Sequence, residues 1–190
     1  MWAVSASAQV GSVQSLDIRI PVAPQPVRVG ETVHVFYELL LTNYASGAAT
    51  LNAIAVLNGT TSAVLKSFEG DALAALLVLS SDAKDMQPRT IPAGMHGAVY
   101  MTLPLEQAPP AKLSHRIKLS VPGRTETRSA TLNSDVLSID TTPLLELSPP
   151  LRGGTWAALY DPAMERGHRR VFYAVDGHAH VADAVRLRGH

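Results

Sequence analysis

The chain has 190 residues, of which 46% are hydrophobic and 17% charged, so it carries enough apolar side chains to fold around a core. Its 16 basic and 16 acidic residues cancel, which argues against a nucleic-acid partner. It has no cysteine, which excludes a disulfide framework and thiolate chemistry. No run approaches the roughly 18–20 apolar residues that span a bilayer, so no transmembrane segment is expected.

Residues 1–13 allow two interpretations. Ala6-Ser7-Ala8 before Gln9 has the small-x-small form of a signal-peptidase site, which would make this stretch the remnant of a signal peptide. The alternative is a flexible terminus rich in Ser and Ala. The first interpretation predicts a periplasmic or secreted protein.

The strand around which the fold is organised is predicted at residues 33–42. Val35, Tyr37 and Leu39 alternate onto one face, and period-two alternation of such residues favours a strand over a helix. Phe36 makes the other face partly apolar, which favours a central position in a sheet.

The stretches around this strand are also mostly extended. Residues 16–20 alternate as a first strand, and prolines 21, 24 and 26 then exclude the middle of a sheet. Asn58-Gly59 between two extended runs predicts a two-residue hairpin turn with positive φ at both positions. Residues 72–79 are continuously apolar, which leaves a buried strand and a short helix both open.

The second half of the sandwich carries the most regular alternation, over residues 112–121. Leu113, Ile117 and Leu119 are predicted core residues, and His115 on the same face is predicted to be partly buried and hydrogen-bonded. Pro122-Gly123 turns the chain into residues 124–132, whose charged and Thr-rich sequence is typical of an edge strand.

Two further elements precede this hairpin. Residues 91–94 (IPAG) predict a type I turn, with Pro second and Gly fourth. Residues 97–105 then alternate with Val99, Met101 and Leu103 on one face. Seven or eight short strands with turns between them predict an all-β fold, an immunoglobulin-like antiparallel β-sandwich over residues 14–138.

A linker and a short β appendage are predicted after the sandwich. Residues 139–154 contain three prolines and a Gly-Gly pair, which is typical of a linker. Residues 155–190 are too few for their own core, yet they carry Trp156, Tyr160, Phe172 and Tyr173. We therefore expect this extension to dock and bury Trp156, with residues after 177 the most mobile.

The motifs RGG (152–154), WAALYDP (156–162), ERGHRRV (165–171) and YAVDG (173–177) follow in one stretch. This stretch resembles the segment that joins an N-terminal β-rich region to the peptidase domain in some bacterial M23-type (lysostaphin-like) zinc metallopeptidases. The resemblance implies zinc-dependent cleavage of peptide crosslinks in cell walls, outside the cytoplasm. In that family the metal site uses a His and an Asp well separated in sequence, plus a later His-x-His.

The same resemblance implies that this chain is the front portion, with the peptidase domain missing and the 155–190 extension truncated. No His and Asp pair at family-like spacing lies downstream of Gly177. The implied role is therefore non-catalytic, positioning or binding, with a cell-wall polymer or a peptidase domain as partner. Zinc would belong to the missing domain, and no other cofactor is expected. The alternatives are a standalone envelope-binding or structural module, and a weak metal-binding protein.

Two groups of side chains are candidate sites. His178 and His180 stand at i and i+2, so on a strand they share a face and could reach one Zn²⁺, with Asp176 beside them if the strand extends back. Their position before the peptidase domain means that the family His-x-His does not transfer to them, and a solvated pair is the simpler interpretation. A basic cluster could contact phosphate or a wall polymer, or simply form a solvated turn; it consists of Arg166, His168, Arg169 and Arg170. No catalytic residue is predicted, since neither a Gly-x-Ser-x-Gly elbow nor a phosphate loop is present.

Overall fold

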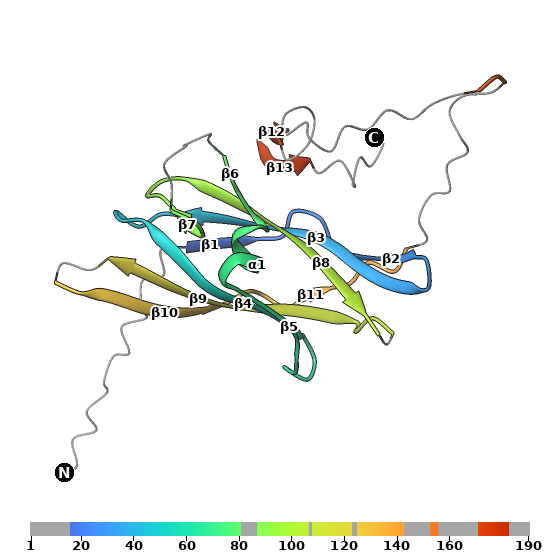
Figure 1. Cartoon of the computed structure of the whole chain (residues 1–190), viewed down its shortest axis with the longest axis horizontal. Helices are drawn as coiled ribbons and strands as arrows, with labels where there is room; N and C mark the ends of the chain where they lie inside the picture. The colour runs from blue at the N-terminus through green and yellow to red at the C-terminus, as the bar shows by residue number, and fades with distance from the viewer. Residues whose placement is uncertain are drawn as a thin grey trace, which may run out of the picture.

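The computed structural model describes residues 16–80, 87–106, 108–122, 125–142, 153–155 and 171–182. Two antiparallel sheets pack face to face, and a separate two-stranded hairpin lies beside them (Figure 1). This confirms the predicted all-β antiparallel sandwich. The immunoglobulin-like type stays a prediction. No helix in the described part of the chain is long and apolar enough to cross a membrane.

The first sheet, here called the β3 sheet, is built around the long strand β3 (Thr32–Asn43), which confirms its predicted central place. Strand β8 pairs along one side of β3, and β1 and β2 pair with the two ends of the other side. The other strands of this sheet are β1 (Leu16–Arg19), β2 (Gln25–Val29), β6 (Leu77–Leu79) and β8 (His96–Leu105).

Prolines shape the outer side of the β3 sheet. Pro21 and Pro24 separate β1 from β2, as predicted, but Pro26 lies within β2 and opposite Val35. The prediction that these prolines are excluded from the middle of a sheet is confirmed, because β2 is an outer strand and accommodates Pro26. Its position is compatible with its missing N–H because β2 pairs with β3 alone among the described strands.

The second sheet, here called the β4 sheet, has the strand order β10-β9-β4-β5. The polar strand predicted at residues 124–132 corresponds to β10, which stands at the edge of the sheet as expected. The strands of this sheet are β4 (Ala49–Asn58), β5 (Val64–Glu69), β7 (Thr90–Ile91), β9 (Lys112–Pro122), β10 (Thr127–Asn133) and β11 (Leu137–Ser138).

The core lies between the two sheets and is built from the predicted faces. Val35, Tyr37 and Leu39 of β3 are at most 1% exposed. Leu113, Ile117 and Leu119 of β9 are at most 4% exposed, and Val99, Met101 and Leu103 of β8 are also buried. Full burial of such side chains contributes about 1.5–3 kcal/mol each. The alternating pattern therefore determines which face of each sheet packs against the other sheet.

The connection between β4 and β5 differs from the predicted two-residue turn. Strand β5 begins only at Val64, and the residue with positive φ is Ser62, at +61°. The Asn58 side chain accepts hydrogen bonds from the backbone N–H groups of Thr60 and Thr61, and Gly59 N–H donates to the carbonyl of Lys112 on β9. Because these bonds hold the Asn-Gly pair against the neighbouring strand, the reversal needs a longer loop.

Residues 72–79 contain both of the structures that the sequence left open. The short helix α1 (Gly70–Ala74) is followed directly by strand β6, and Leu73 is fully buried. The helix carries the chain from β5 in one sheet to β6 in the other. A continuous apolar run is compatible with both the helix and the strand, because both elements contact the core.

The turn predicted at residues 91–94 lies one residue later. Met95 N–H donates to the carbonyl of Pro92 at 3.1 Å, and Gly94 is the third residue of the turn, with φ of +72°. A glycine with positive φ at this position is the requirement of a type II turn rather than the predicted type I. The Gly94 N–H instead donates to the carbonyl of Asn43 at 2.8 Å.

The C-terminal hairpin pairs β12 (Val171–Val175) with β13 (His178–Ala182). Asp176 and Gly177 join them with φ of +50° and +79°, the geometry of a two-residue type I′ turn. Strand β13 begins directly after Gly177, and the expectation that the residues after Gly177 are the most mobile stays a prediction. The predicted docking of Trp156 lies outside the described residues.

Candidate functional site

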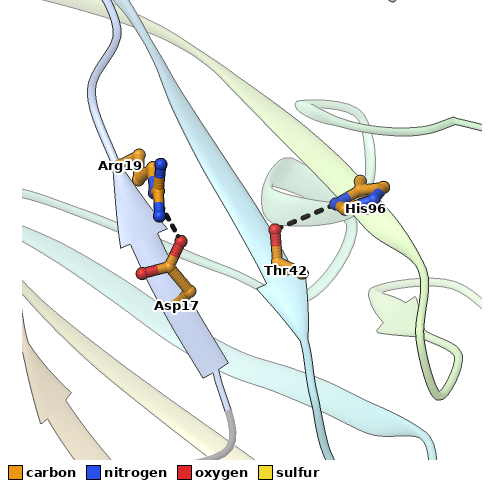
Figure 2. A network of polar contacts seen from close by, with 4 residues as sticks. All are labelled: Asp17, Arg19, Thr42 and His96. Atoms are coloured by element: carbon orange, nitrogen blue, oxygen red, sulfur yellow. Dashed lines mark hydrogen bonds and ion pairs between the residues drawn. The ribbon is translucent and has the colours of Figure 1, made fainter. Parts of the chain in front are cut away.

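A row of polar side chains crosses the outer face of the β3 sheet (Figure 2). Because Val35, Tyr37, Leu39 and Leu41 of β3 face the core, the alternate residue Thr42 faces outward. Asp17 on β1 and His96 on β8 are its direct cross-strand partners. The row therefore follows from the register of three strands that are far apart in the sequence.

The polar contacts in this row are made in pairs. The Arg19 guanidinium donates through Nε to Asp17 Oδ2 at 2.8 Å. Thr42 Oγ1 and His96 Nδ1 are 2.9 Å apart. The Arg19 side chain is 71% exposed, so this ion pair contributes little to stability and its guanidinium can reach a ligand.

Two grooves lie between this part of the sandwich and the hairpin. The first, here called the face groove, has a volume of about 390 Å³, and aromatic side chains from β12 stand opposite the polar row. Its lining consists of Asp17, Arg19, Leu40, Thr42, Tyr44, Ser80, His96, Phe172, Tyr173, Gly177, His178 and Ala179. Aromatic rings opposite a few convergent polar groups are typical of a binding site.

The second groove, here called the edge groove, has a volume of about 570 Å³ and lies at the end of β1. One wall comes from β1 and the residues after it, and the other from the connection between β10 and β11. Its lining consists of Ile18, Arg19, Ile20, Pro21, Leu40, Ser134, Asp135, Leu137, His178 and Ala179.

The two grooves meet at the hairpin. Both are lined by Arg19 and Leu40 of the β3 sheet and by His178 and Ala179 of the hairpin. Because they share these four lining residues, the face groove and the edge groove lie next to each other at the start of β13. Together they offer an elongated ligand a path from the outer face of the sheet around its edge.

A buried hydrogen-bond chain links the two sheets just behind the edge groove. His115 is 0% exposed, and its Nε2 lies 2.8 Å from the hydroxyl of Tyr37. Its Nδ1 lies 3.1 Å from Oγ of Ser134, which also accepts the His115 backbone N–H. The Ser134 hydroxyl donates its own proton to the carbonyl of Asp135.

These contacts assign the protonation of the ring. Since the Ser134 proton is used by Asp135, the proton between Ser134 and His115 must belong to Nδ1. Nε2 then accepts the hydrogen bond from Tyr37. Burial lowers the pKa of His115 from 6.5 to about 4, so the neutral ring is the stable form.

The Ser134–His115–Tyr37 chain resembles a catalytic arrangement only in composition. A serine nucleophile must give its proton to the imidazole, whereas here the imidazole donates to the serine. A pKa of about 4 also makes His115 a poor base at neutral pH. The arrangement therefore joins the two sheets and orders the wall of the edge groove.

The predicted histidine pair is placed on β13. His178 stands opposite Val175 and His180 opposite Tyr173, and His178 is exposed and lines both grooves. Asp176 belongs to the turn and not to β13, so the condition under which it would share a face with the two histidines is not met. Within the described ranges, no group of three or more His, Asp or Glu could hold a metal ion.

The predicted basic cluster lies outside the described residues; it comprises Arg166, His168, Arg169 and Arg170. Among the residues that line the grooves, the sequence singled out His178, Phe172 and Tyr173, but not the polar residues of the β3 sheet. Alternation could have shown that Asp17, Thr42 and His96 face outward. Only the strand register, which a single sequence does not reveal, brings them into one row.

The chain is an all-β antiparallel sandwich with two open grooves at one end of the β3 sheet. No family model matches the chain, and the comparison with curated proteins finds no match.

Two solved structures are similar to most of the chain. The Northeast Structural Genomics Consortium target SoR45 has 12% identity and a TM-score of 0.40, over 74% of this chain and 97% of that one. Target BeR40 from Bordetella pertussis, which carries the name ApaA, has 15% identity and a TM-score of 0.40, over 68% and 99%. Similarity at this level does not bear on function.

Proposed function

We propose that this chain is the non-catalytic accessory β-sandwich of an exported bacterial cell-wall peptidase of the M23 type, acting by binding or positioning. The cell-wall setting comes from the resemblance of residues 151–177. The observation that supports a binding role is the continuous path formed by the face and edge grooves. Its volumes fall in the roughly 300–1,000 Å³ range of ligand sites.

The chemistry of the face groove suits a wall polymer. Tyr173 and Tyr44 are 44% and 70% exposed, and each offers an apolar ring with a polar tip. Arg19 and Asp17 provide planar hydrogen-bonding groups on the opposite wall. Rings and planar polar groups together can bind a chain that carries both C–H surfaces and hydroxyl or amide groups.

Co-sedimentation of the purified chain with purified peptidoglycan sacculi tests the proposal. Tyr173→Ala should weaken retention about fivefold or more, since an aromatic side chain at the centre of a site typically contributes at least about 1 kcal/mol. Val64→Ala is the matched control, because Val64 is 56% exposed on β5 and lines neither groove. Equal retention of both variants, or no retention of the unmodified chain, would contradict the binding role.

The genomic sequence that follows the codon for His190 tests the accessory assignment separately. Coding sequence for a peptidase domain, in the same frame, would support it. If retention on sacculi is found without such a domain, the chain is instead a standalone envelope-binding module.

A further inference from the structure

Strand β1 presents a free edge. It is the last strand of its sheet, and its pairing with β3 occupies one side. In an antiparallel pair, successive residues direct their N–H and C=O groups alternately toward the partner and away from it. Half of the β1 residues therefore direct these groups away from β3, and no strand among the described residues pairs with them. A row of this kind is a template for one more strand.

The free edge is confined to β1. The same side of the sheet continues as β2, where Pro26 has no N–H to offer. Pro21 and Pro24 interrupt the edge between the two strands. The usable edge is therefore the four residues of β1, about 13 Å long, which matches a ligand segment of four to six residues.

The edge groove overlaps the second half of this edge, since Ile18 and Arg19 of β1 line it and Leu16 and Asp17 do not. Four consecutive residues, 18–21, form one of its walls, and Ser134, Asp135 and Leu137 form the other. A strand added to β1 would therefore lie between the end of β1 and the connection from β10 to β11, and not in open solvent. His178 and Ala179, at the start of β13, also line the groove.

The side chains along the groove alternate in character. Ile18, Ile20 and Leu137 are partly buried and pack against the core, whereas Arg19 is exposed on the outer face. An extended peptide directs its side chains alternately to two sides, so one set would contact the apolar residues and the other would face Arg19 and solvent.

We infer that the edge groove is a peptide-binding site, in which an extended segment of a partner protein adds to β1 as a further strand. The ligand class is a peptide with alternating apolar and polar side chains, because only a peptide repeats N–H and C=O groups at strand spacing. This inference rests on the binding role proposed above, but not on its cell-wall setting.

The probe is a library of acetylated hexapeptide amides in which Val, Leu or Ile alternates with Thr, Glu or Lys. Binding is followed by NMR on the ¹⁵N-labelled full chain, and the tightest member defines the site. Amide signals of residues 17–21 and 134–137 should shift. No binding at 1 mM by any member, or shifts confined to the β5 or β10 edges, would overturn the inference.

N-methylation of the tightest peptide tests strand addition without altering the protein. One derivative is methylated at the odd amides and the other at the even amides. One derivative should lose at least tenfold in affinity and the other much less, because only alternate N–H groups face β1. An equal effect of both derivatives would show binding through side chains and overturn the inference.

A protein variant gives an independent measurement. Ile20→Lys places a charge on the apolar wall and should weaken peptide binding at least tenfold. Val64→Lys is the matched control, because Val64 is 56% exposed on β5 and lines neither groove. Peptide binding without retention on sacculi would contradict the proposed function alone. Retention on sacculi without peptide binding would contradict this inference alone.

Discussion

His115 shows how one side chain can join two sheets. Its ring bridges Tyr37 on β3 and Ser134 after β10, so the sandwich is held by directional bonds as well as by apolar contact. Removal of one partner would leave a buried polar group unpaired, which costs about 1–3 kcal/mol. The same burial makes the ring sensitive to acid.

Stability should fall in acid because of His115. Its pKa is about 4 in the folded chain and 6.5 when exposed, so the unfolded state binds more protons between these values. The contribution of the neutral ring is complete above pH 6.5 and is lost as the pH falls toward about 4. The difference corresponds to about 3 kcal/mol in the free energy of unfolding.

Urea unfolding from pH 7 to pH 4 measures this effect. In His115→Gln the slope of stability against pH should be smaller over this range, whereas His96→Gln, which removes a histidine on the outer face, should keep it. The same slope in His115→Gln and the unmodified chain would show that another group causes the acid sensitivity.

Leu119 is a second test at the residue scale. It lies on the core-facing side of β9 and is only 4% exposed. Leu119→Ala should therefore lower the free energy of unfolding by about 2–5 kcal/mol. Val64→Ala, at an exposed position, should change it by less than about 0.5 kcal/mol. Similar midpoints in urea for both variants would contradict the register of β9.

At the scale of elements, the β4–β5 connection depends on close contact with β9. A Cβ added at Gly59 would lie 2.9 Å from side-chain atoms of Lys112 and Val136 and 3.0 Å from the Lys112 carbonyl carbon. Gly59→Ala should therefore destabilise the chain by about 1–3 kcal/mol through overpacking.

Gly47→Ala is the control for this substitution. Its Cβ would meet Pro122 at 3.6 Å or more, an ordinary contact distance, and its φ is not positive. Thermal unfolding of the two variants compares them directly. A loss of stability in Gly47→Ala as large as that in Gly59→Ala would show that the clash with β9 is not the cause.

The C-terminal hairpin should be the least stable element among the described residues. Its two strands pair with each other and with no other described strand, and an isolated two-stranded hairpin is marginal in water. Amides of residues 171–175 and 178–182 should exchange with solvent faster than those of β3 and β9. Equal protection would mean that the hairpin and the sandwich unfold as one unit.

At the scale of the whole molecule, the grooves are a consequence of sheet order. β1 ends one sheet and β11 pairs with β9 in the other, and residues of both strands line the edge groove together with residues of the hairpin. The grooves therefore combine residues from both ends of the sequence. The proposed binding would depend on the fold as a whole.

The purified chain should not hydrolyse peptidoglycan crosslinks, with or without added zinc. The expectation follows from the resemblance, which assigns the metal ligands to a domain beyond this chain. Release of soluble fragments from sacculi, measured by chromatography, checks it. Zinc-dependent release that is abolished in His178→Ala would contradict the proposal and give the histidine pair a catalytic role.

Local pattern was sufficient for much of this fold. Alternation identified β3, β8 and β9 and the faces that form the core, because burial of one face of a strand is encoded at a period of two residues. The polar edge strand β10 followed from its charges. Local pattern was not sufficient for the Asn58-Gly59 turn, where contact with β9 overrides the intrinsic preference of the pair.

The site depended on tertiary structure. Asn43 was not predicted to be buried, yet it is 0% exposed because its side chain bonds to Ala45, Gly47 and Ile91. Arg19 and His178 likewise line the same two grooves although 159 positions separate them (178 − 19). A sequence determines which residues prefer to be buried and which strands they form. Which polar residues then meet depends on strand register and sheet order, and these are set by packing between distant segments.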